Sequence, residues 1–185
     1  ISDAELTHRA AYSIGANGSP AAVSETAIEI LLIAGTGSIA VSISPIDGKL
    51  VRAGGLGHDR GDEGSGNWIG GKIKDIALVD PAFASCEVLR ACVRMHRMSE
   101  DVSAGEGSLE TTPSASLAST LDDLAAIFPA AAELADHAGR ELAAIVQSVY
   151  DQQRALYQVR SPDADLAGIA GSVRCYGSVL KNSKS

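Results

Sequence analysis

The four residues Gly35-Thr36-Gly37-Ser38 lie between two segments that have the apolar pattern of short β-strands. Small residues let backbone N–H groups come close to an anion, and the hydroxyls of Thr36 and Ser38 add two hydrogen-bond donors. A turn of this composition suits the phosphates of a nucleotide. An ordinary glycine-rich β-turn has the same composition, and for so short a motif taken alone that plainer interpretation is favoured.

A second glycine-rich block extends from Gly54 to Gly70 and joins a predicted strand to a predicted helix. Eleven of the 19 glycines lie between Gly35 and Gly71, and such crowding indicates a backbone pressed against a ligand. Within this block, the Asp62 carboxylate could hold two hydroxyls of a sugar. Its alternative role is that of an acid favoured by the positive end of a helix, with Ser65 as the N-cap.

Two further residues carry groups that could take part in chemistry. Asp3 lies in the sequence Ser2-Asp3-Ala4, and a lone Asp in such a place is usually the N-cap of a helix. His58 has no partner ligand at helical spacing, so the sequence predicts no metal site.

The hydrophobic pattern predicts strands in the first third of the chain and mostly helices after it. Apolar or alternating runs predict strands over 28–34, 39–44 and 50–53, with a hairpin turn at Asp47-Gly48. After Gly61 the period changes from 2 to 3.6 residues, which predicts a helix from about Ser65. The other predicted elements are a helix over 82–98, a mobile loop over Ser99–Ser119, a helix over Pro129–Gln158, a strand over Asp165–Ala170 and a helix from Val173.

These elements predict one α/β domain over residues 1–185, with a mixed sheet flanked by helices. The net charge of −8 argues against nucleic acid as the main partner, because phosphate backbones need a basic field. No apolar run is long enough to cross a bilayer, and the first ten residues are too polar for a signal peptide. Three cysteines without a CxxC spacing then favour reduced thiols and a cytoplasmic location.

The order of the motifs resembles the N-acetylglucosamine kinase family and, more widely, the BadF/BadG-type ATPases of the actin-like sugar kinase superfamily. The match extends over almost the whole chain. The motifs that carry it are, in order, Ser2-Asp3-Ala4, LLIAGTGSIA, GGLGHDRGDEGSGNWIG and LAGIAGSV. The resemblance implies the C-terminal domain of an actin-like ATPase, with a ribonuclease-H-like core. It also implies ATP and Mg²⁺ as cofactors and the phosphorylation of an amino sugar.

The resemblance assigns a role to each motif. Asp3 matches the general base that takes the proton from the sugar hydroxyl. The implied substrate-binding residues are Thr36, Gly37, Gly55 and Asp62. The implied nucleotide-binding residues are the phosphate turn Gly35, Thr36, Gly37 and Ser38 and an adenosine turn formed by Ala170, Gly171 and Ser172.

The chain also departs from the family pattern. The superfamily builds its site between two domains, and the first domain, with its own phosphate hairpin, is not in this sequence. We therefore expect a truncated C-terminal part that is inactive, or nearly so, as an isolated fragment. Leu56 stands where the family usually has Trp beside the sugar, Asp59-Arg60 replaces a pair that is usually apolar, and Ala170 replaces a Gly.

Two alternatives therefore stay open. One is an ATP-driven activator that holds an iron–sulfur cluster through cysteines, for which the spacing of Cys86, Cys92 and Cys175 is poor. The other is a kinase-like fragment without turnover. The expected partners are a small-molecule sugar and ATP, without nucleic acid or membrane, and the sequence leaves open whether the chain forms a homodimer.

Overall fold

The computed structural model describes residues 27–44, 47–57, 60–99, 108–160 and 170–179. Within these ranges, four strands form one mixed sheet in the order β3-β2-β1-β4. β1 (Ala27–Ala34), β2 (Ser38–Ile43) and β3 (Leu50–Gly54) are antiparallel neighbours, and β4 (Ala170–Tyr176) pairs in parallel with β1. The three antiparallel strands expected from the sequence are confirmed to within one residue at each end.

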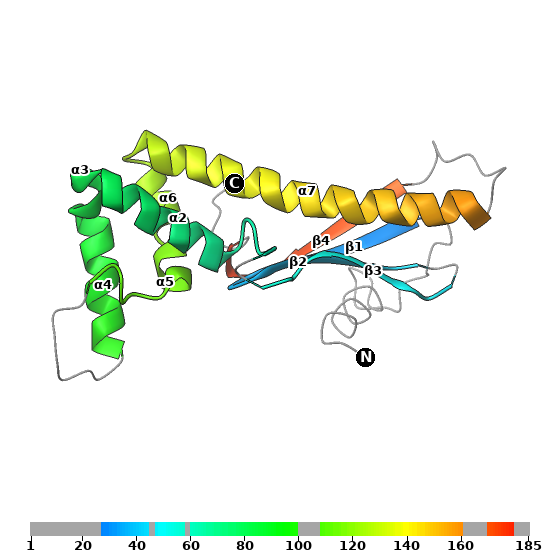
Figure 1. Cartoon of the computed structure of the whole chain (residues 1–185), viewed down its shortest axis with the longest axis horizontal. Helices are drawn as coiled ribbons and strands as arrows, with labels where there is room; N and C mark the ends of the chain where they lie inside the picture. The colour runs from blue at the N-terminus through cyan, green and yellow to red at the C-terminus, as the bar shows by residue number, and fades with distance from the viewer. Residues whose placement is uncertain (1–26, 45–46, 58–59, 100–107, 161–169, 180–185) are drawn as a thin grey trace, which may run out of the picture.

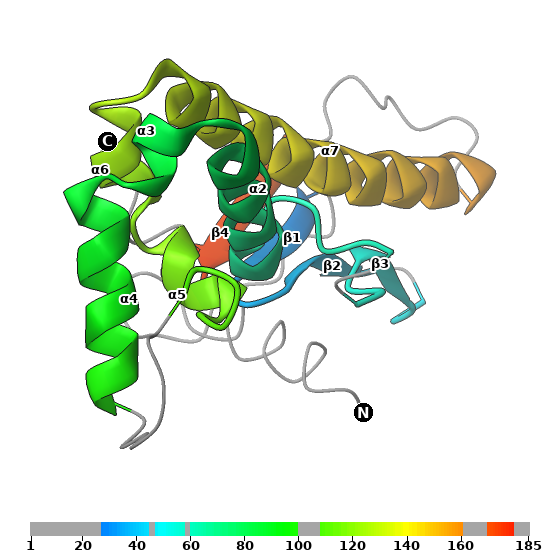
Figure 2. The same cartoon turned by 60° about the vertical axis from the view of Figure 1, so that its left-hand side comes forward.

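The helices gather at one end of the sheet and along one of its faces, as Figures 1 and 2 show. In the described ranges, no helix is both long enough and apolar enough to span a bilayer. The helices are α2 (Gly66–Val79), α3 (Pro81–Ala84), α4 (Glu87–Ser99), α5 (Ser114–Ala118), α6 (Leu121–Ala125) and α7 (Pro129–Arg160).

The expected helix over 82–98 is divided in two. Asp80 caps α3, and its carboxylate accepts hydrogen bonds from the N–H groups of Ala82 (2.9 Å) and Phe83 (3.1 Å). This cap and Pro81 start a single turn of helix that buries Phe83 completely. A new helix, α4, then begins at Glu87.

The prediction of a loop over Ser99–Ser119 is wrong for the second half of that segment. Residues 100–107 lie outside the described part of the chain, but Ser114–Ala118 forms α5. Leu117 is fully buried in α5, and α5 packs on α2. This segment is rich in small polar residues and would be a weak helix in isolation. It is helical here because burial of Leu117 and packing on α2 stabilise it.

The last strand lies further along the chain than expected. Residues 161–169 are outside the described residues, and Ala170–Tyr176 forms β4, so Val173 belongs to a strand rather than to a helix. The parallel register with β1 pairs Ala27 with Ala170 and Ile33 with Tyr176. Pairing with a buried neighbouring strand decides the conformation of this segment, which also contains the β-forming residues Val173 and Tyr176.

Helix α7 contributes to the two larger of the three hydrophobic clusters in the described structure. Alternate residues of β1 point toward α7 and pack with its middle and its second half, where Leu142, Val149 and Tyr157 are buried. Its first half, with Ala131, Leu134 and Ala138, packs on the core formed by α2 to α6. The two cores therefore meet beside the middle of α7, close to the ends of β1 and β4 (Figure 1).

Candidate functional site

The turn Gly35–Ser38 is held by the beginning of α2. The N–H of Gly66 donates to the carbonyl of Gly35 (2.7 Å), and the N–H of Asn67 donates to the carbonyl of Thr36 (3.1 Å). The next N–H of α2 donates to the Ser65 hydroxyl, which is the N-cap expected from the sequence. These bonds use the first three amides of α2 within the protein, so the start of α2 fixes the turn.

Asp62 lies against the same turn, although 24 residues separate it from Ser38. The N–H of Ser38 donates to Asp62 Oδ1 over 3.4 Å, and the Ser38 hydroxyl donates to the Glu63 carbonyl at 2.8 Å. The N–H of Gly55 donates to the carbonyl of Ser38 at 2.8 Å. Asp62 is only 8% exposed and lines one groove together with Gly35–Ser38, so the expectation that Asp62 and the turn meet in one place is confirmed.

The turn borders two hollows of different character. On one side is an open groove lined by Gly37, Ser38, Gly55 and Asp62, together with Ile33 and Ile39. On the other side, Gly35 and Thr36 form part of the wall of a cavity of about 260 Å³. Gly35 and Thr36 line both hollows, so this turn separates them.

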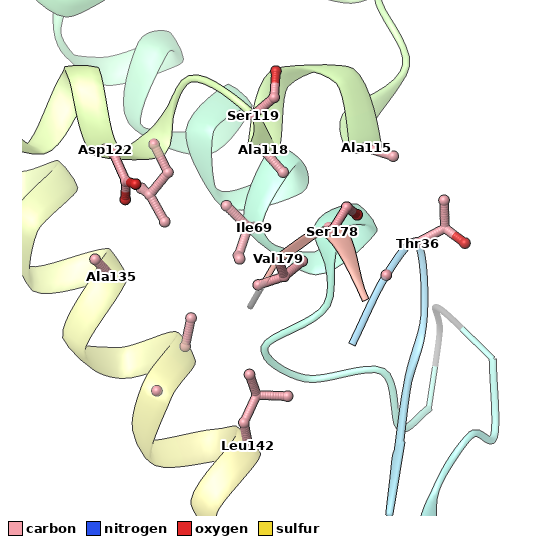
Figure 3. A pocket seen from close by; sticks show the side chains of 15 residues that line it. Thr36, Ile69, Ala115, Ala118, Ser119, Asp122, Ala135, Leu142, Ser178 and Val179 are labelled. Carbon is pink, nitrogen blue, oxygen red and sulfur yellow. The ribbon is translucent and has the colours of Figure 1, made fainter. Parts of the chain in front are cut away.

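The cavity lies where the sheet, α2 and α7 meet, and Figure 3 shows the side chains around it. Its walls are mostly apolar, with Ile69 of α2 and Leu142 of α7 facing Val179. Helix α7 also contributes the small residues Ala135, Ala138 and Gly139, and a Cβ added at Gly139 would meet no described atom within 4 Å. The space beside α7 therefore exists because these residues lack bulky side chains.

The turn that follows β4 completes the cavity, and sequence reasoning missed it. Gly177 has a φ of +125°, and a Cβ there would collide with the Ala34 backbone at the end of β1. Ser178 and Val179 follow in helical conformation and line the cavity. The chain has Gly-Ser-Val twice, at 171–173 and at 177–179. The second copy is the sequence feature that could have identified this turn.

The turn expected at Ala170-Gly171-Ser172 is wrong, because these residues lie inside β4; their expected contact with adenosine stays a prediction. They pair with the beginning of β1, from Ala27 to Glu29. Gly171 is six residues from Gly177, about 20 Å along an extended strand. A Cβ at Gly171 would lie 3.1 Å from the Tyr150 ring of α7, so this glycine has a packing role at the far end of the sheet.

Other expected site residues lie elsewhere. Asp3 is outside the described residues. The three cysteines are free and lie on separate parts of the fold, between α3 and α4, in α4 and in β4. Burial raises the pKa of the Cys92 thiol. In the described part of the chain, no three His, Cys, Asp or Glu residues gather as a metal site.

A solved structure shows what this chain is similar to. No protein-family model matches the chain, and no curated protein matches it. Among solved structures, the chain is similar to the "Putative N-acetylglucosamine Kinase from Chromobacterium violaceum", with a TM-score of 0.50 and 24% sequence identity. The likeness covers 92% of this chain and 53% of that protein, so this chain spans about half of its length.

A likeness at 24% identity shows the fold alone. It confirms the expected fold class, an α/β domain in which helices flank a mixed sheet.

Proposed function

We propose that this chain forms the nucleotide- and sugar-binding part of an ATP-dependent kinase for an amino sugar such as N-acetylglucosamine. One observation carries the proposal. The turns that follow the parallel strands β1 and β4, Gly35–Thr36 and Gly177–Val179, end beside one apolar cavity. Ligands of α/β proteins bind outside the carboxyl ends of parallel strands, where such turns meet.

In this proposal the two hollows have separate tasks. The cavity, with Ile69, Leu142 and Val179, takes the nucleoside, because its walls are apolar and it has a few polar groups at its edges. The phosphates then extend past Thr36 toward the groove that contains Asp62. Phosphoryl transfer depends mainly on positioning and on stabilising charge, and a turn fixed on both sides by hydrogen bonds suits that task.

Mg²⁺ belongs to the same proposal as a companion of the nucleotide. Mg²⁺ in such sites is usually held through one or two carboxylates together with the phosphates. Asp62 is a carboxylate in contact with the turn, which fits this arrangement. When bound, Mg²⁺ would neutralise charge on the phosphates.

Sugar binding is proposed for the groove side of the turn. Asp62 Oδ1 lies near the Ser38 amide, and the carboxylate also lines the groove beside Gly55. A carboxylate can accept two hydrogen bonds from neighbouring sugar hydroxyls. Asp3, as the proposed general base, would take the proton from the hydroxyl that attacks the phosphate.

Calorimetric titration of Mg-ATP into the 185-residue chain tests the nucleotide part of the proposal. Gly139→Leu should weaken ATP binding tenfold or more, because the new side chain would occupy the cavity. Ala143→Leu is the matched control, since Ala143 lies one turn further along α7 and is exposed. Equal ATP affinity in both variants would show that the nucleotide binds elsewhere, and absence of binding to the unmodified chain would refute the proposed function.

Saturation-transfer NMR with N-acetylglucosamine, glucosamine and glucose tests the sugar part. Asp62→Asn should abolish the transfer from the sugar that binds. Glu63→Gln is the control, because Glu63 contacts Ser38 through its backbone carbonyl. Unchanged transfer in Asp62→Asn would exclude Asp62 as a sugar ligand.

A further inference from the structure

The two ends of the cavity beside α7 differ in chemistry. At one end lie the turn residues Gly35 and Thr36. The Gly35 N–H already donates to the Gly37 carbonyl at 2.9 Å, so the donors at this end are the N–H and the hydroxyl of Thr36. At the other end lies Asp122 of α6, and Figure 3 shows it well apart from Thr36, with Ile69 and Val179 between them. Among the described residues that line this cavity, Asp122 alone carries a charge.

The position of Asp122 in its helix explains its charge but not its place on the cavity wall. Asp122 and Asp123 both lie in the first turn of α6, where the helix dipole favours an acidic residue. Both are exposed, but only Asp122 lines the cavity. Within the described residues, the Asp122 carboxylate makes no hydrogen bond or ion pair, so its oxygens remain able to accept hydrogen bonds from a ligand.

The charge of Asp122 restricts which part of a nucleotide can come near it. A carboxylate only accepts hydrogen bonds when ionised, and it repels phosphate. Asp62 also lies beside the turn at the Thr36 end, but there the Thr36 N–H and hydroxyl can donate to phosphate and a Mg²⁺ held by Asp62 would offset the charge of that carboxylate. The phosphates of a bound nucleotide should therefore lie toward Thr36, and the nucleoside should lie toward Asp122. The groups of a nucleoside that can satisfy a carboxylate are the O–H donors of the ribose diol and the N–H donors of the base.

On the basis of the proposed function, we propose that Asp122 is a specificity-determining residue that selects ligands carrying nucleoside hydrogen-bond donors and sets the direction of the nucleotide in the cavity. A hydrogen bond to a charged group contributes about 1.5–3 kcal/mol. Loss of such a contact corresponds to a decrease in affinity of about tenfold or more, since about 1.4 kcal/mol is a factor of ten.

The test compares two ligands that share the phosphates but not the nucleoside. The dissociation constants of Mg-ATP and of Mg-tripolyphosphate are measured for the unmodified chain, Asp122→Asn and the matched control Asp123→Asn. Asp122→Asn should weaken ATP binding about tenfold without weakening tripolyphosphate binding. Asp123→Asn should change neither, because Asp123 has the same place in α6 but does not line the cavity.

The possible results separate this proposal from the proposed function. If ATP binds the unmodified chain and Asp122→Asn equally well, or if Asp122→Asn weakens both ligands equally, the role of Asp122 is refuted while nucleotide binding stands. If ATP does not bind the unmodified chain, the proposed function fails and this inference fails with it. Thermal melting of the three proteins shows whether any loss of binding comes from unfolding.

Two further ligands identify which donor Asp122 accepts. 2′,3′-Dideoxy-ATP lacks both ribose hydroxyls, and purine riboside triphosphate lacks the amino group of the base. The ligand that has lost the relevant donor should bind the unmodified chain about tenfold more weakly than ATP and should be insensitive to Asp122→Asn. If both analogues bind like ATP and both are weakened by Asp122→Asn, neither donor is the partner and the proposal is overturned.

Discussion

At the scale of single residues, the buried polar groups of the described structure are unevenly satisfied. Asp62 and Ser38 are buried and hydrogen-bonded at the turn. Gln153 of α7 is fully buried between Val149 and Tyr157 on the face that packs on the sheet, and neither polar atom of its amide has a partner among the described residues. A buried amide without a partner costs free energy, because it has lost its hydrogen bonds with water.

Replacing Gln153 with Met should therefore stabilise the fold. Met has a similar length and adds no polar group that must be desolvated, so the free energy of unfolding should rise by about 1–3 kcal/mol. Urea denaturation followed by circular dichroism measures this change. Gln152→Met is the control; Gln152 is exposed and donates to Ser148 at 3.2 Å, so its replacement should change stability little. A clear loss of stability in Gln153→Met would mean that the buried amide has a partner.

Glu29 gives a prediction of pH dependence. Burial raises the pKa of this β1 carboxyl above its usual value of 4.5, and Arg174 on the neighbouring strand offsets part of that rise. An acid with a raised pKa in the folded state binds its proton more tightly when folded, so its contribution to stability is present below pH 4.5 and is lost as the pH rises through the folded value.

Glu29→Gln removes this titration. The variant and the unmodified chain should differ little in stability below pH 4.5, and the variant should be the more stable one at neutral pH. Urea denaturation across this range measures the difference. A variant that is less stable at neutral pH would show that attraction to Arg174 outweighs the cost of burial.

At the scale of elements, the contact between α2 and α5 determines the shape of the cavity wall. Leu117 of α5 is fully buried, and Ala115 and Ala118 line the cavity opposite α7. The backbone of Ser114 lies so close to α2 that a Cβ at Gly70 would overlap its carbonyl. The next residue, Gly71, has open space around it among the described atoms.

These two glycines form a matched pair for mutation. Gly70→Ala should push α5 from α2 and lower the free energy of unfolding by about 1–3 kcal/mol. Gly71→Ala should raise it by about 0.5–1 kcal/mol, because Ala favours a helix more than Gly does. Denaturation curves of both variants give the comparison. Equal effects of the two substitutions would mean that α5 does not approach α2 as described.

The same elements show what the sequence could and could not predict. Local signals were sufficient for the hairpin around Asp47-Gly48, for the Ser65 cap and for the long amphipathic α7, because each depends on residues close in the chain. α5 was missed because its five residues are helical through contact with α2. The two Gly-Ser-Val copies look alike locally, and only the register of β4 against β1 shows which one reaches the cavity.

At the scale of the whole molecule, the candidate site depends on segments that are far apart in the sequence. The cavity joins the turn after β1, the α5–α6 region, the middle of α7 and the turn after β4. It lies between the core of the sheet and the core of the helices, and Val179 packs against both. A ligand in this position would contact both cores at once, so its binding should order distant segments together.

Hydrogen–deuterium exchange of the 185-residue chain with and without saturating Mg-ATP tests this account most directly. Nucleotide should slow exchange together in peptides that contain Gly35–Ser38, Ala115–Asp122 and Gly177–Val179, because these segments meet at the cavity. Peptides of α4, Glu87–Ser99, should be unchanged, because α4 does not line the cavity. Unchanged exchange at all three segments, or slowing confined to α4, would contradict the central claim that this cavity binds a nucleotide.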